Sequence, residues 1–418
     1  MVALSKLGLL FPGQGSQYTG MGKDLYDNFQ TARDTFDEAC DVLSFDLKAL
    51  CFEGDIEQLS RTSNAQPAIL TASVAAFRVL MQEIKPAPAY AAGHSLGEFT
   101  ALACSGALSF ADAVSLVRCR GKLMEEAAGS ESGGMLAVTG LSEEILADIC
   151  VRTSSIQSYV SIANYNSAEQ IVISGHTAAL DKAKDEIEKL GAGTIPLKVS
   201  APFHTAVMAK ASEAFGQELR GYAYGRFKWP VIANLSGTPY ADRRFIVPNL
   251  TQQMARPVQW YKSMQYLLNQ DVSSFIEVGP RTVLMKLIKT ISGSSRAFSM
   301  EHVSHLQELR KAGMEAGPDG LGLIVACIAA AVTTQNRNWD NGQYEQGVIV
   351  PYRRIQELRE RLEKTGSEPS LEEMQFALTM LKSILNTKFT PLEEQEERFE
   401  RMLYATNTQD LFPAFQVS

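Results

Sequence analysis

Residues 93–99 read GHSLGEF and place Ser95 between two glycines. The pattern G-x-S-x-G is typical of a nucleophile elbow, in which a sharp turn from a strand to a helix lifts a serine hydroxyl above the end of a sheet. The preceding residues, AYAAG, suit a short strand, and the following residues, LGEFTALACSGAL, suit a helix. The motif therefore has the context that it requires, and it predicts an α/β fold around a reactive serine.

The composition is that of an ordinary globular protein, with 418 residues, 45% of them hydrophobic and 21% charged. This length allows two or three domains. The formal net charge of −8 argues against binding to nucleic acid or to an anionic membrane, because such partners require basic surface. Any anionic ligand must then meet a local basic group.

The pattern of histidines and cysteines predicts neither a metal nor a cofactor. The six cysteines are scattered without a C-x-x-C pair, and no histidine lies at metal-ligand spacing from them. The apolar run at the N-terminus is too short for a secretory signal, and residues 321–332, the most apolar later segment, are too few to span a bilayer. We expect a cytoplasmic protein without a membrane span.

Changes of pattern along the chain predict three parts. Residues 1–129 and 200–300 are predicted to form an α/β-hydrolase-like large domain around the elbow. Residues 130–199 follow the order β-α-β-β-α-β, which is typical of ferredoxin-like folds, and we interpret them as a small domain inserted into the large one. Residues 301–418 are predicted to form a helical C-terminal extension.

Two helices can be predicted in more detail. The apolar run 67–84 indicates a core helix with Pro67 in its first turn, where its missing N–H is not needed. In the extension, leucines and a methionine recur at steps of three and four between residues 371 and 385, as on the buried face of a helix. Ser370 and Glu373 have the spacing of a capping box, which marks the start of this helix.

A free serine hydroxyl is a poor nucleophile at neutral pH, so Ser95 needs a base. His94 is adjacent in sequence, but neighbouring side chains diverge at such a turn, which makes His94 a poor candidate. His204 lies in the loop-like stretch SAPFHTAVM between a strand and a helix, and composition alone would favour a surface histidine there. The local pattern therefore leaves the base undecided.

Six motifs occur in one order along the chain and together point to a family. They are FPGQGSQYTGMG (11–22), GHSLGE (93–98), RCRGKLMEEA (118–127), ANYNS (163–167), APFHTAVM (201–208) and MARPVQW (254–260). This order closely resembles the malonyl-CoA:acyl carrier protein transacylases and the acyltransferase domains of polyketide synthases, over residues 5–295. The resemblance implies that a malonyl group passes from malonyl-CoA to Ser95, and then to the phosphopantetheine thiol of an acyl carrier protein.

The resemblance implies a role for each residue of the reaction centre. Ser95 would be the nucleophile, and His204 would take its proton and later deprotonate the incoming thiol. A backbone carbonyl near the position matched by Gln253 would orient the histidine in place of a carboxylate. The backbone N–H groups of Leu96 and Gln14 would hold the tetrahedral oxyanion.

Further residues would determine which acyl group is accepted. The resemblance makes Arg120 a clamp on the free carboxylate of a malonyl group, a task that suits a planar guanidinium. Arg118 is interpreted as a helix-surface cation. Phe203 matches the form associated with malonyl over methylmalonyl, with simple core packing as the alternative. Asn164 and Asn166 match the loop with which the family lines the cleft, and they would support it.

Docking of the carrier protein is expected to depend on local cations, because acyl carrier proteins are themselves acidic. The candidates are Arg281, Lys286 and Lys289, in the stretch GPRTVLMKLIKT. A solvated helix face is the plainer explanation of these three charges.

Two other functions stay open at this point. An acyl-carrier-protein hydrolase would share the serine and the histidine, but such relatives commonly lack the arginine clamp, so Arg120 favours transfer. A non-catalytic docking protein would keep the fold while its helical tail recruits a synthase, and a failure of Ser95 to acylate would favour it. The extension beyond residue 300 departs from the short transacylases of fatty-acid synthesis, and it favours a free-standing enzyme that serves a polyketide or lipopeptide assembly line in trans.

Overall fold

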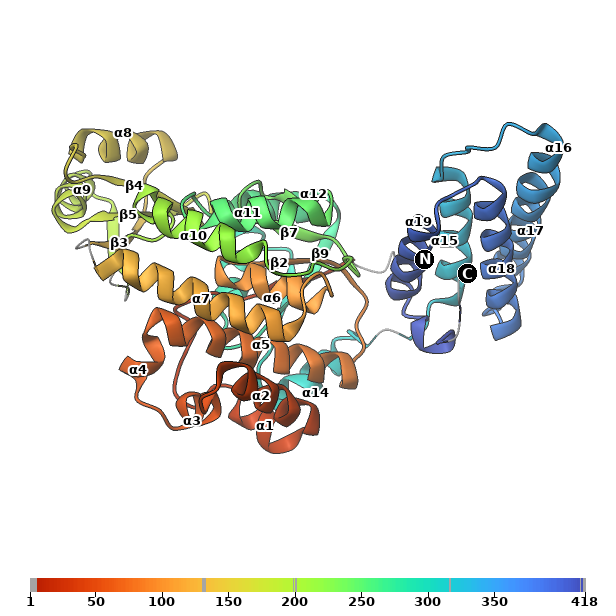
Figure 1. Cartoon of the computed structure of the whole chain (residues 1–418), viewed down its shortest axis with the longest axis horizontal. Helices are drawn as coiled ribbons and strands as arrows, with labels where there is room; N and C mark the ends of the chain where they lie inside the picture. The colour runs from red at the N-terminus through yellow and green to blue at the C-terminus, as the bar shows by residue number, and fades with distance from the viewer. Residues whose placement is uncertain are drawn as a thin grey trace. The chain divides into compact units, whose positions relative to one another are not determined.

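The computed structural model describes residues 6–129, 133–197, 199, 201–315, 317–413 and 415 (Figure 1). The chain divides into two compact units. Unit 1 lies within Met1–Glu83 and Pro88–Ala312, and unit 2 lies within Ile84–Ala87 and Gly313–Ser418.

A six-stranded sheet forms the centre of unit 1, and it is parallel except for one edge strand. In sheet order the strands are β10 (Arg296–Met300), β9 (Val272–Val278), β1 (Lys6–Phe11), β2 (Pro88–Gly93), β7 (Val231–Ala233) and the antiparallel β8 (Thr238–Pro239). The predicted strand before the elbow is therefore β2, in the interior of the sheet. Its carboxyl end, like that of β1 beside it, is where parallel sheets carry their functional residues.

Helices cover both faces of this sheet. Before the inserted part they are α1 (Lys23–Asn28), α2 (Gln30–Leu43), α3 (Leu47–Phe52), α4 (Ile56–Ser60), α5 (Thr62–Glu83), α6 (Leu96–Cys104) and α7 (Phe110–Gly129). After it they are the 3₁₀ turn η1 (Ala206–Met208), α10 (Ala209–Leu219), the 3₁₀ turn η2 (Arg243–Phe245), α11 (Ile246–Gln253), α12 (Trp260–Asn269), α13 (Val283–Ile291) and α14 (Val303–Lys311).

The alternation of β1 residues shows how the two faces are covered. Leu10 joins a buried cluster with Met264 of α12 and Ile288 of α13. Phe11 faces the other side, where its ring lies 6.3 Å from that of Phe77 in α5. Because both faces are buried, the strand reads as one apolar run rather than as an alternating pattern.

The inserted part has the element order that the sequence predicts. The elements are β3 (Gly133–Thr139), α8 (Glu143–Thr153), β4 (Val160–Tyr165), β5 (Gln170–His176), α9 (Thr177–Lys189) and β6 (Gly193–Pro196). The strands form an antiparallel sheet in the order β4-β5-β3-β6, and one face of it packs on both helices. The predicted boundaries at residues 130 and 200 lie outside the described residues.

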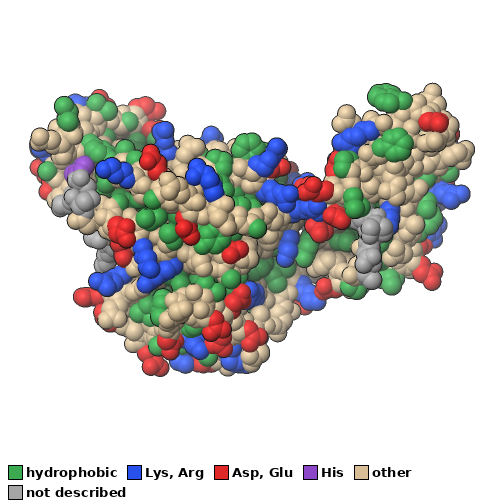
Figure 2. Space-filling view, in the orientation of Figure 1, with side chains coloured by type: hydrophobic (Ala, Val, Ile, Leu, Met, Phe, Trp, Pro, Cys, Tyr) green, Lys and Arg blue, Asp and Glu red, His purple; other side chains and the backbone are tan. Residues whose placement is uncertain are grey.

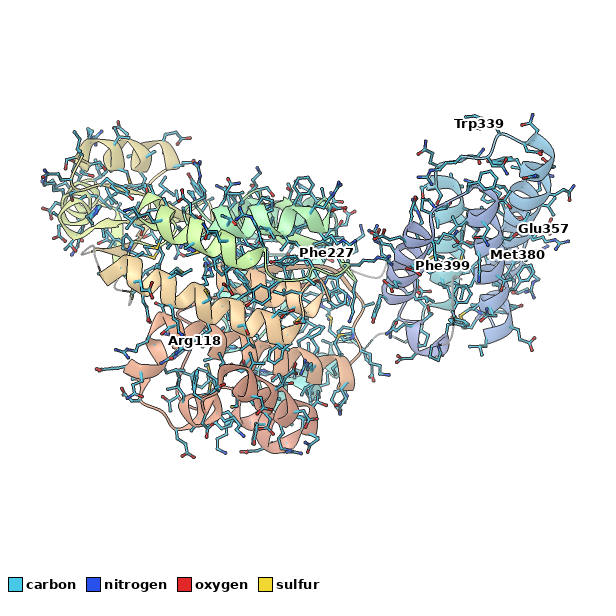
Figure 3. All side chains as sticks on the ribbon, in the orientation of Figure 1. Arg118, Phe227, Trp339, Glu357, Met380 and Phe399 are labelled. Atoms are coloured by element: carbon cyan, nitrogen blue, oxygen red, sulfur yellow. The ribbon has the colours of Figure 1, made fainter. Side chains whose placement is uncertain are left out.

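Core helix α5 begins at Thr62, five residues before the predicted start, so that Pro67 lies inside the helix. Proline has no N–H to donate to the carbonyl four residues before it, which here is that of Ser63. Arg118 of α7 donates from Nη1 to this carbonyl at 2.5 Å and to Asn64 Oδ1 at 2.6 Å. Arg118, labelled in Figure 3, is therefore half-buried and structural, and the interpretation as a surface cation is wrong.

Unit 2 is a bundle of helices. They are α15 (Gly320–Thr333), α16 (Asn341–Tyr344), the π-helical turn η3 (Glu345–Ile349), α17 (Val350–Thr365), α18 (Leu371–Thr387), α19 (Leu392–Ala405) and the 3₁₀ turn η4 (Gln409–Leu411). The capping box of Ser370 and Glu373 is present at the start of α18. Among the residues that the structure describes, no helix is long and apolar enough to cross a membrane.

The core of unit 2 is apolar and separate from the sheet of unit 1. It joins α15, α17, α18 and α19, and Phe399 of α19 is 2% exposed within it. Figure 3 labels this residue inside the bundle, whereas Trp339, 87% exposed, lies at the top of the bundle in this view. On the face that Figure 2 shows, acidic and basic side chains are mixed over both units rather than gathered by sign.

The helical extension begins later than residue 301, the predicted boundary, because unit 1 continues to Ala312. β10 adds a parallel strand to β9, so the sheet itself extends to Met300. The N–H of Val303, at the start of α14, donates to Asp24 Oδ2 at 2.8 Å. The pairing of β10 with β9 and the hydrogen bond to Asp24 attach α14 to unit 1, although the sequence of α14 alone resembles that of the helical tail.

Candidate active site

Ser95 lies in a tight turn between β2, which ends at Gly93, and α6, which begins at Leu96. Its φ of 52° and ψ of −105° are strained values for a residue with a side chain. A Cβ added to Gly93 would lie 1.9 Å from the backbone of Gly97, and one added to Gly97 would lie 2.1 Å from Phe11 O. The two glycines are therefore required by close backbone contact, as the elbow motif predicts.

Asn234, which follows β7, forms hydrogen bonds with the backbone of the elbow at Ser95 and at Gly93. Its Oδ1 accepts a hydrogen bond from the Ser95 N–H at 2.7 Å, and its Nδ2 donates to Gly93 O at 2.7 Å. Asn234 is 1% exposed. We infer that these two bonds help to hold the strained turn, a contribution that the sequence pattern did not indicate.

His204 is in hydrogen-bond contact with Ser95. Its Nε2 lies 2.8 Å from Ser95 Oγ, and its Nδ1 lies 2.8 Å from the carbonyl oxygen of Gln253. A carbonyl only accepts, so Nδ1 carries the proton and Nε2 is free to accept from the serine. Burial, followed by the nearby charge of Arg120, lowers the pKa of His204 to about 3, which keeps the ring neutral near pH 7.

His94 points away from this pair. Its Nε2 lies 3.0 Å from Asn166 Oδ1, and its ring lies 5.5 Å from that of Trp260. Asn166 in turn donates from Nδ2 to Gln170 Oε1 at 3.0 Å. Asn166 therefore anchors the histidine beside the nucleophile, and it does not act on Ser95 directly.

Arg120 enters the site from α7 and is 1% exposed. Its Nη2 donates to Ser95 Oγ at 3.1 Å and to Gln253 Oε1 at 2.9 Å, and its Nη1 donates to Gln66 Oε1 at 2.9 Å. Burial lowers the pKa of Arg120 to about 10, so the guanidinium remains charged near pH 7. Among the described residues none accepts a hydrogen bond from its buried Nε.

Gly121 allows Arg120 to reach the site. A Cβ at Gly121 would lie 2.6 Å from Ser63 Cα and 2.7 Å from Thr62 O, both in α5. The two helices can pack this closely only where α7 has no side chain.

Glu98 and Tyr240 form a buried extension of this network that the motifs did not reveal. Gln253 Nε2 donates to Glu98 Oε2 at 2.7 Å, and Tyr240 Oη donates to Glu98 Oε1. Burial raises the pKa of Glu98 to about 7. One signal was available in the sequence, because Glu98 follows Ser95 by three residues on the first turn of a helix.

The predicted oxyanion donors lie at the two sides of the elbow. Leu96 is the first residue of α6, where helical N–H groups have no intrahelical acceptor. Gln14 follows β1 in a turn that crosses the elbow, since a Cβ at Gly13 would lie 2.5 Å from His94 O. The positive φ of 101° at Gly15 shapes this turn. Gln14 Nε2 also donates to Thr62 Oγ1 at 3.1 Å.

The remaining predicted residues lie at different depths. Phe203 is 5% exposed and directly precedes His204, while Asn164 is 6% exposed and pairs by its backbone with Val258. Arg281 lines a cleft of about 720 Å³. Its other lining residues are Gln14, Gly15, Gln17, Ile56, Glu57, Ser60, Pro196, Leu197 and Val199.

The other two predicted docking cations lie outside that cleft lining. Lys286 and Lys289 are exposed on α13, on the same side of the helix because they are three residues apart. Within the described residues, no cluster of His, Cys, Asp and Glu is arranged to hold a metal ion.

An α/β sheet with a strained serine, a paired histidine and a buried arginine is the architecture of an acyl transferase domain. The family model described as "Acyl transferase domain" matches residues 9–315, and the chain belongs to this family. A malonyl CoA-acyl carrier protein transacylase of Bacillus subtilis is 40% identical over 396 residues, which are 94% of this chain and 99% of that protein. The enzyme of the same description from Escherichia coli K12 is 40% identical over 302 residues, 72% of this chain and 97% of that protein.

Solved structures agree with this assignment. The malonyl CoA-acyl carrier protein transacylase from Clostridium perfringens has a TM-score of 0.71 at 36% identity, covering 74% of this chain and 98% of that one. A malonyl-transacylase in complex with its type II PKS acyl-carrier protein has a TM-score of 0.71 at 37% identity, covering 74% of this chain and 100% of that one. The α/β fold of unit 1 is thus confirmed. The 396-residue match extends into unit 2, because unit 1 ends at Ala312.

Proposed function

We propose that this protein moves a malonyl group from malonyl-CoA to an acyl carrier protein through an acyl-enzyme on Ser95. One observation carries the proposal, namely the buried guanidinium of Arg120 at 3.1 Å from the Ser95 hydroxyl. A permanent cation beside a serine nucleophile suits an acyl group that itself ends in a carboxylate. The relatives at about 40% identity carry the same activity in their names.

The proposed reaction has two halves that use the same groups. In the first, Ser95 Oγ attacks the thioester carbonyl while His204 Nε2 takes the hydroxyl proton, and the backbone N–H groups of Leu96 and Gln14 receive the oxyanion. The tetrahedral adduct collapses, and CoA leaves as a thiol with the proton from His204. Acyl-serine remains.

In the second half, His204 takes the proton of the carrier thiol, whose sulfur attacks the acyl-serine. Collapse of this adduct returns the proton to Ser95 Oγ and leaves the malonyl group on the carrier. Gln253 O holds the proton-bearing Nδ1 of the histidine at 2.8 Å throughout. The scheme uses side chains and backbone groups of the chain alone, without a cofactor or a metal.

Arg120 would bind the malonyl carboxylate through the part of the guanidinium that faces the nucleophile, where Nη2 lies 3.1 Å from Ser95 Oγ. Phe203, buried beside the base, would limit the room at the 2-carbon and so disfavour methylmalonyl, and Asn164 would support the cleft from β4.

The carrier protein would approach along the cleft that Arg281 shares with Gln14. This geometry favours Arg281 over Lys286 and Lys289 as the cation nearest the reaction centre, and the two lysines would extend the docking surface along α13.

Unit 2 supports a role beyond housekeeping fatty-acid synthesis. The Escherichia coli relative matches 72% of the chain, whereas one Bacillus subtilis relative matches 94%, so an extension of this kind is shared with some members only. We therefore propose a free-standing enzyme that serves a polyketide or lipopeptide assembly line in trans. The six cysteines are unpaired, which suits the cytoplasm.

We also propose that unit 1 combines an α/β-hydrolase-like large domain with a ferredoxin-like small domain. A parallel sheet that carries a nucleophile elbow at its carboxyl edge supports an α/β-hydrolase-like large domain. The order β-α-β-β-α-β and the sheet order β4-β5-β3-β6 support a ferredoxin-like small domain.

The test is intact-mass detection of the acyl-enzyme after exposure to acetyl-, malonyl- and methylmalonyl-CoA. We expect one malonyl adduct on the wild type and none on Ser95→Ala. His94→Ala is the matched control, because His94 faces Asn166 rather than Ser95 and its loss should leave an acylatable serine. An adduct on Ser95→Ala would refute the assigned nucleophile, and rapid hydrolysis without transfer to a carrier would favour the hydrolase.

A further inference from the structure

The side-chain amide of Gln253 connects three groups of the site. It is 1% exposed. Its Nε2 donates to Ser95 O at 2.8 Å and to Glu98 Oε2 at 2.7 Å, while its Oε1 accepts from Arg120 Nη2 at 2.9 Å. Two acceptors on one side and a cationic donor on the other can be satisfied by one orientation of the amide only.

Glu98 supplies the acceptor that distinguishes this orientation most strongly. In the reversed amide, the Gln253 oxygen would face a carboxylate and its NH₂ group would face a guanidinium. Both contacts would be repulsive at distances where the present ones are charge-assisted hydrogen bonds.

Burial of the Glu98 carboxylate costs free energy that its surroundings must offset. It is 1% exposed, and among the described residues no Lys or Arg forms a direct ion pair with it. A buried carboxylate without a directly paired cation is expensive by several kcal/mol. Its two oxygens instead accept hydrogen bonds from Tyr240 Oη, Gln253 Nε2 and the backbone N–H of Asn234.

We propose that Glu98 is a positioning residue that fixes the Gln253 amide and thereby holds the Arg120 guanidinium beside Ser95, ready for an acyl group that bears a carboxylate. The inference rests on the proposed function, since it concerns the residue that would bind the acyl carboxylate. It adds a residue that selects the substrate without touching it. The proposal predicts a change in selectivity rather than a general loss of activity.

The pH response offers a readout that a purely structural role would not give. The charged or titratable groups that face Glu98 are Tyr240 and Arg120, and its other hydrogen-bond donors, the side-chain amide of Gln253 and the backbone N–H of Asn234, are neutral. Burial raises the pKa of Glu98 to about 7. Protonation below that pH would turn one accepting oxygen into a donor and weaken the hold on the amide.

The test compares Glu98→Gln with a matched control, Glu277→Gln. Glu277 is also 1% exposed, and burial raises its pKa to about 7, but it accepts from the N–H groups of Leu284 and Met285 and has no bond to Gln253. The measurement is kcat/KM for acylation by malonyl-CoA and by acetyl-CoA, with Tm recorded for each variant.

For Glu98→Gln we expect malonyl acylation to fall about tenfold or more, mainly through KM, and acetyl acylation to fall several-fold less. Glu277→Gln should change both substrates by one common factor. In an Arg120→Ala background, Glu98→Gln should have no further effect on the malonyl-to-acetyl ratio, because Glu98 acts through that arginine. If Glu98→Gln does not fold, Tyr240→Phe removes the other donor to Glu98 and should lower the ratio in the same direction.

The failure of this inference is distinguishable from failure of the proposed function. A wild type that forms no malonyl adduct would end the proposed function. A wild type that prefers malonyl, together with an Arg120→Ala variant that loses the preference and a folded Glu98→Gln variant that keeps it, would overturn the role of Glu98 alone. Equal loss of both substrates in Glu98→Gln would also overturn it.

Discussion

Replacement of Arg120 by alanine should slow the transfer of malonyl, which carries a free carboxylate, much more than the transfer of acetyl, which does not. Arg120 is 1% exposed, and its Nη2 lies 3.1 Å from Ser95 Oγ. In the variant, the malonyl carboxylate would enter a buried site without its cationic partner, at a cost of about 2–5 kcal/mol. At about 1.4 kcal/mol for each factor of ten, kcat/KM for malonyl-CoA should fall about 30- to 4,000-fold.

Acetyl transfer should lose much less, because the acetyl group has no carboxylate to pair. The variant also removes the hydrogen bond from Arg120 to Ser95 Oγ, and a hydrogen bond that involves a charged group contributes about 1.5–3 kcal/mol, but this loss is common to both acyl groups. Loss of the nearby cation also raises the pKa of His204, which opposes that decrease slightly. The malonyl-to-acetyl ratio should therefore fall by about tenfold or more.

The assay needs a stability control. Alanine leaves Oε1 of Gln66 and Oε1 of Gln253 without their donor, at about 1–3 kcal/mol each, so Tm should fall. We would measure kcat/KM for both thioesters at a temperature where all variants are folded, and include Arg120→Lys. Lysine restores the charge but not the fork, so its rescue should be partial. Equal loss of malonyl and acetyl transfer in Arg120→Ala would refute the clamp.

Four further predictions concern the base, two pH responses and the docking surface. His204→Ala should slow both half-reactions by about 10²- to 10⁴-fold, because one base serves both, and an effect on deacylation alone would contradict this account. Acetyl-CoA acylation should stay level down to about pH 5, since burial lowers the pKa of His204 to about 3, and a decline centred on the ordinary value of 6.5 would refute this. Malonyl acylation alone should decline below about pH 7, where Glu98 takes up a proton. Charge reversal at Lys286 and Lys289 should raise KM for the carrier at low salt with acylation from CoA unchanged, and reversal at Arg281 should do so more strongly; equal damage to both half-reactions would indicate misfolding instead.

The sequence motif around Ser95 predicted those features of the site that depend on local backbone geometry. Gly93 and Gly97 are required because two backbone segments cross at the elbow, and that requirement is visible in seven residues of sequence. The order of elements in the inserted part was likewise readable from alternating strand and helix periods. The contact between His204 and the carbonyl of Gln253 was expected only through the resemblance, since it joins a loop after the inserted part to the end of α11.

The missed residues owe their position to tertiary contacts. Gln66, Asn234 and Tyr240 lie far from Ser95 in sequence, on or beside α5, β7 and β8, and nothing in their neighbours marks them as polar groups of a buried site. The boundary of the extension was misplaced for a similar reason. β10 belongs to the sheet because it pairs with β9, and this pairing leaves no signal in the strand itself.

The stretch Arg118-Cys119-Arg120-Gly121 places a structural arginine and an active-site arginine on one turn of α7. Residues two apart on a helix do not face the same way, so Arg118 and Arg120 reach different targets. Arg118 donates to the Ser63 carbonyl that Pro67 leaves without its helical partner, and this bond connects α7 to the interrupted turn of α5.

Gly121 allows the same two helices to approach closely, because any Cβ there would lie 2.6 Å from Ser63 Cα. The close approach of α5 and α7 places Arg120 within 2.9 Å of Gln66 and 3.1 Å of Ser95. The position of Arg120 therefore depends on how α5 and α7 pack around Pro67, and if Arg120 binds the acyl carboxylate as proposed, substrate selectivity should be sensitive to the packing of these two helices.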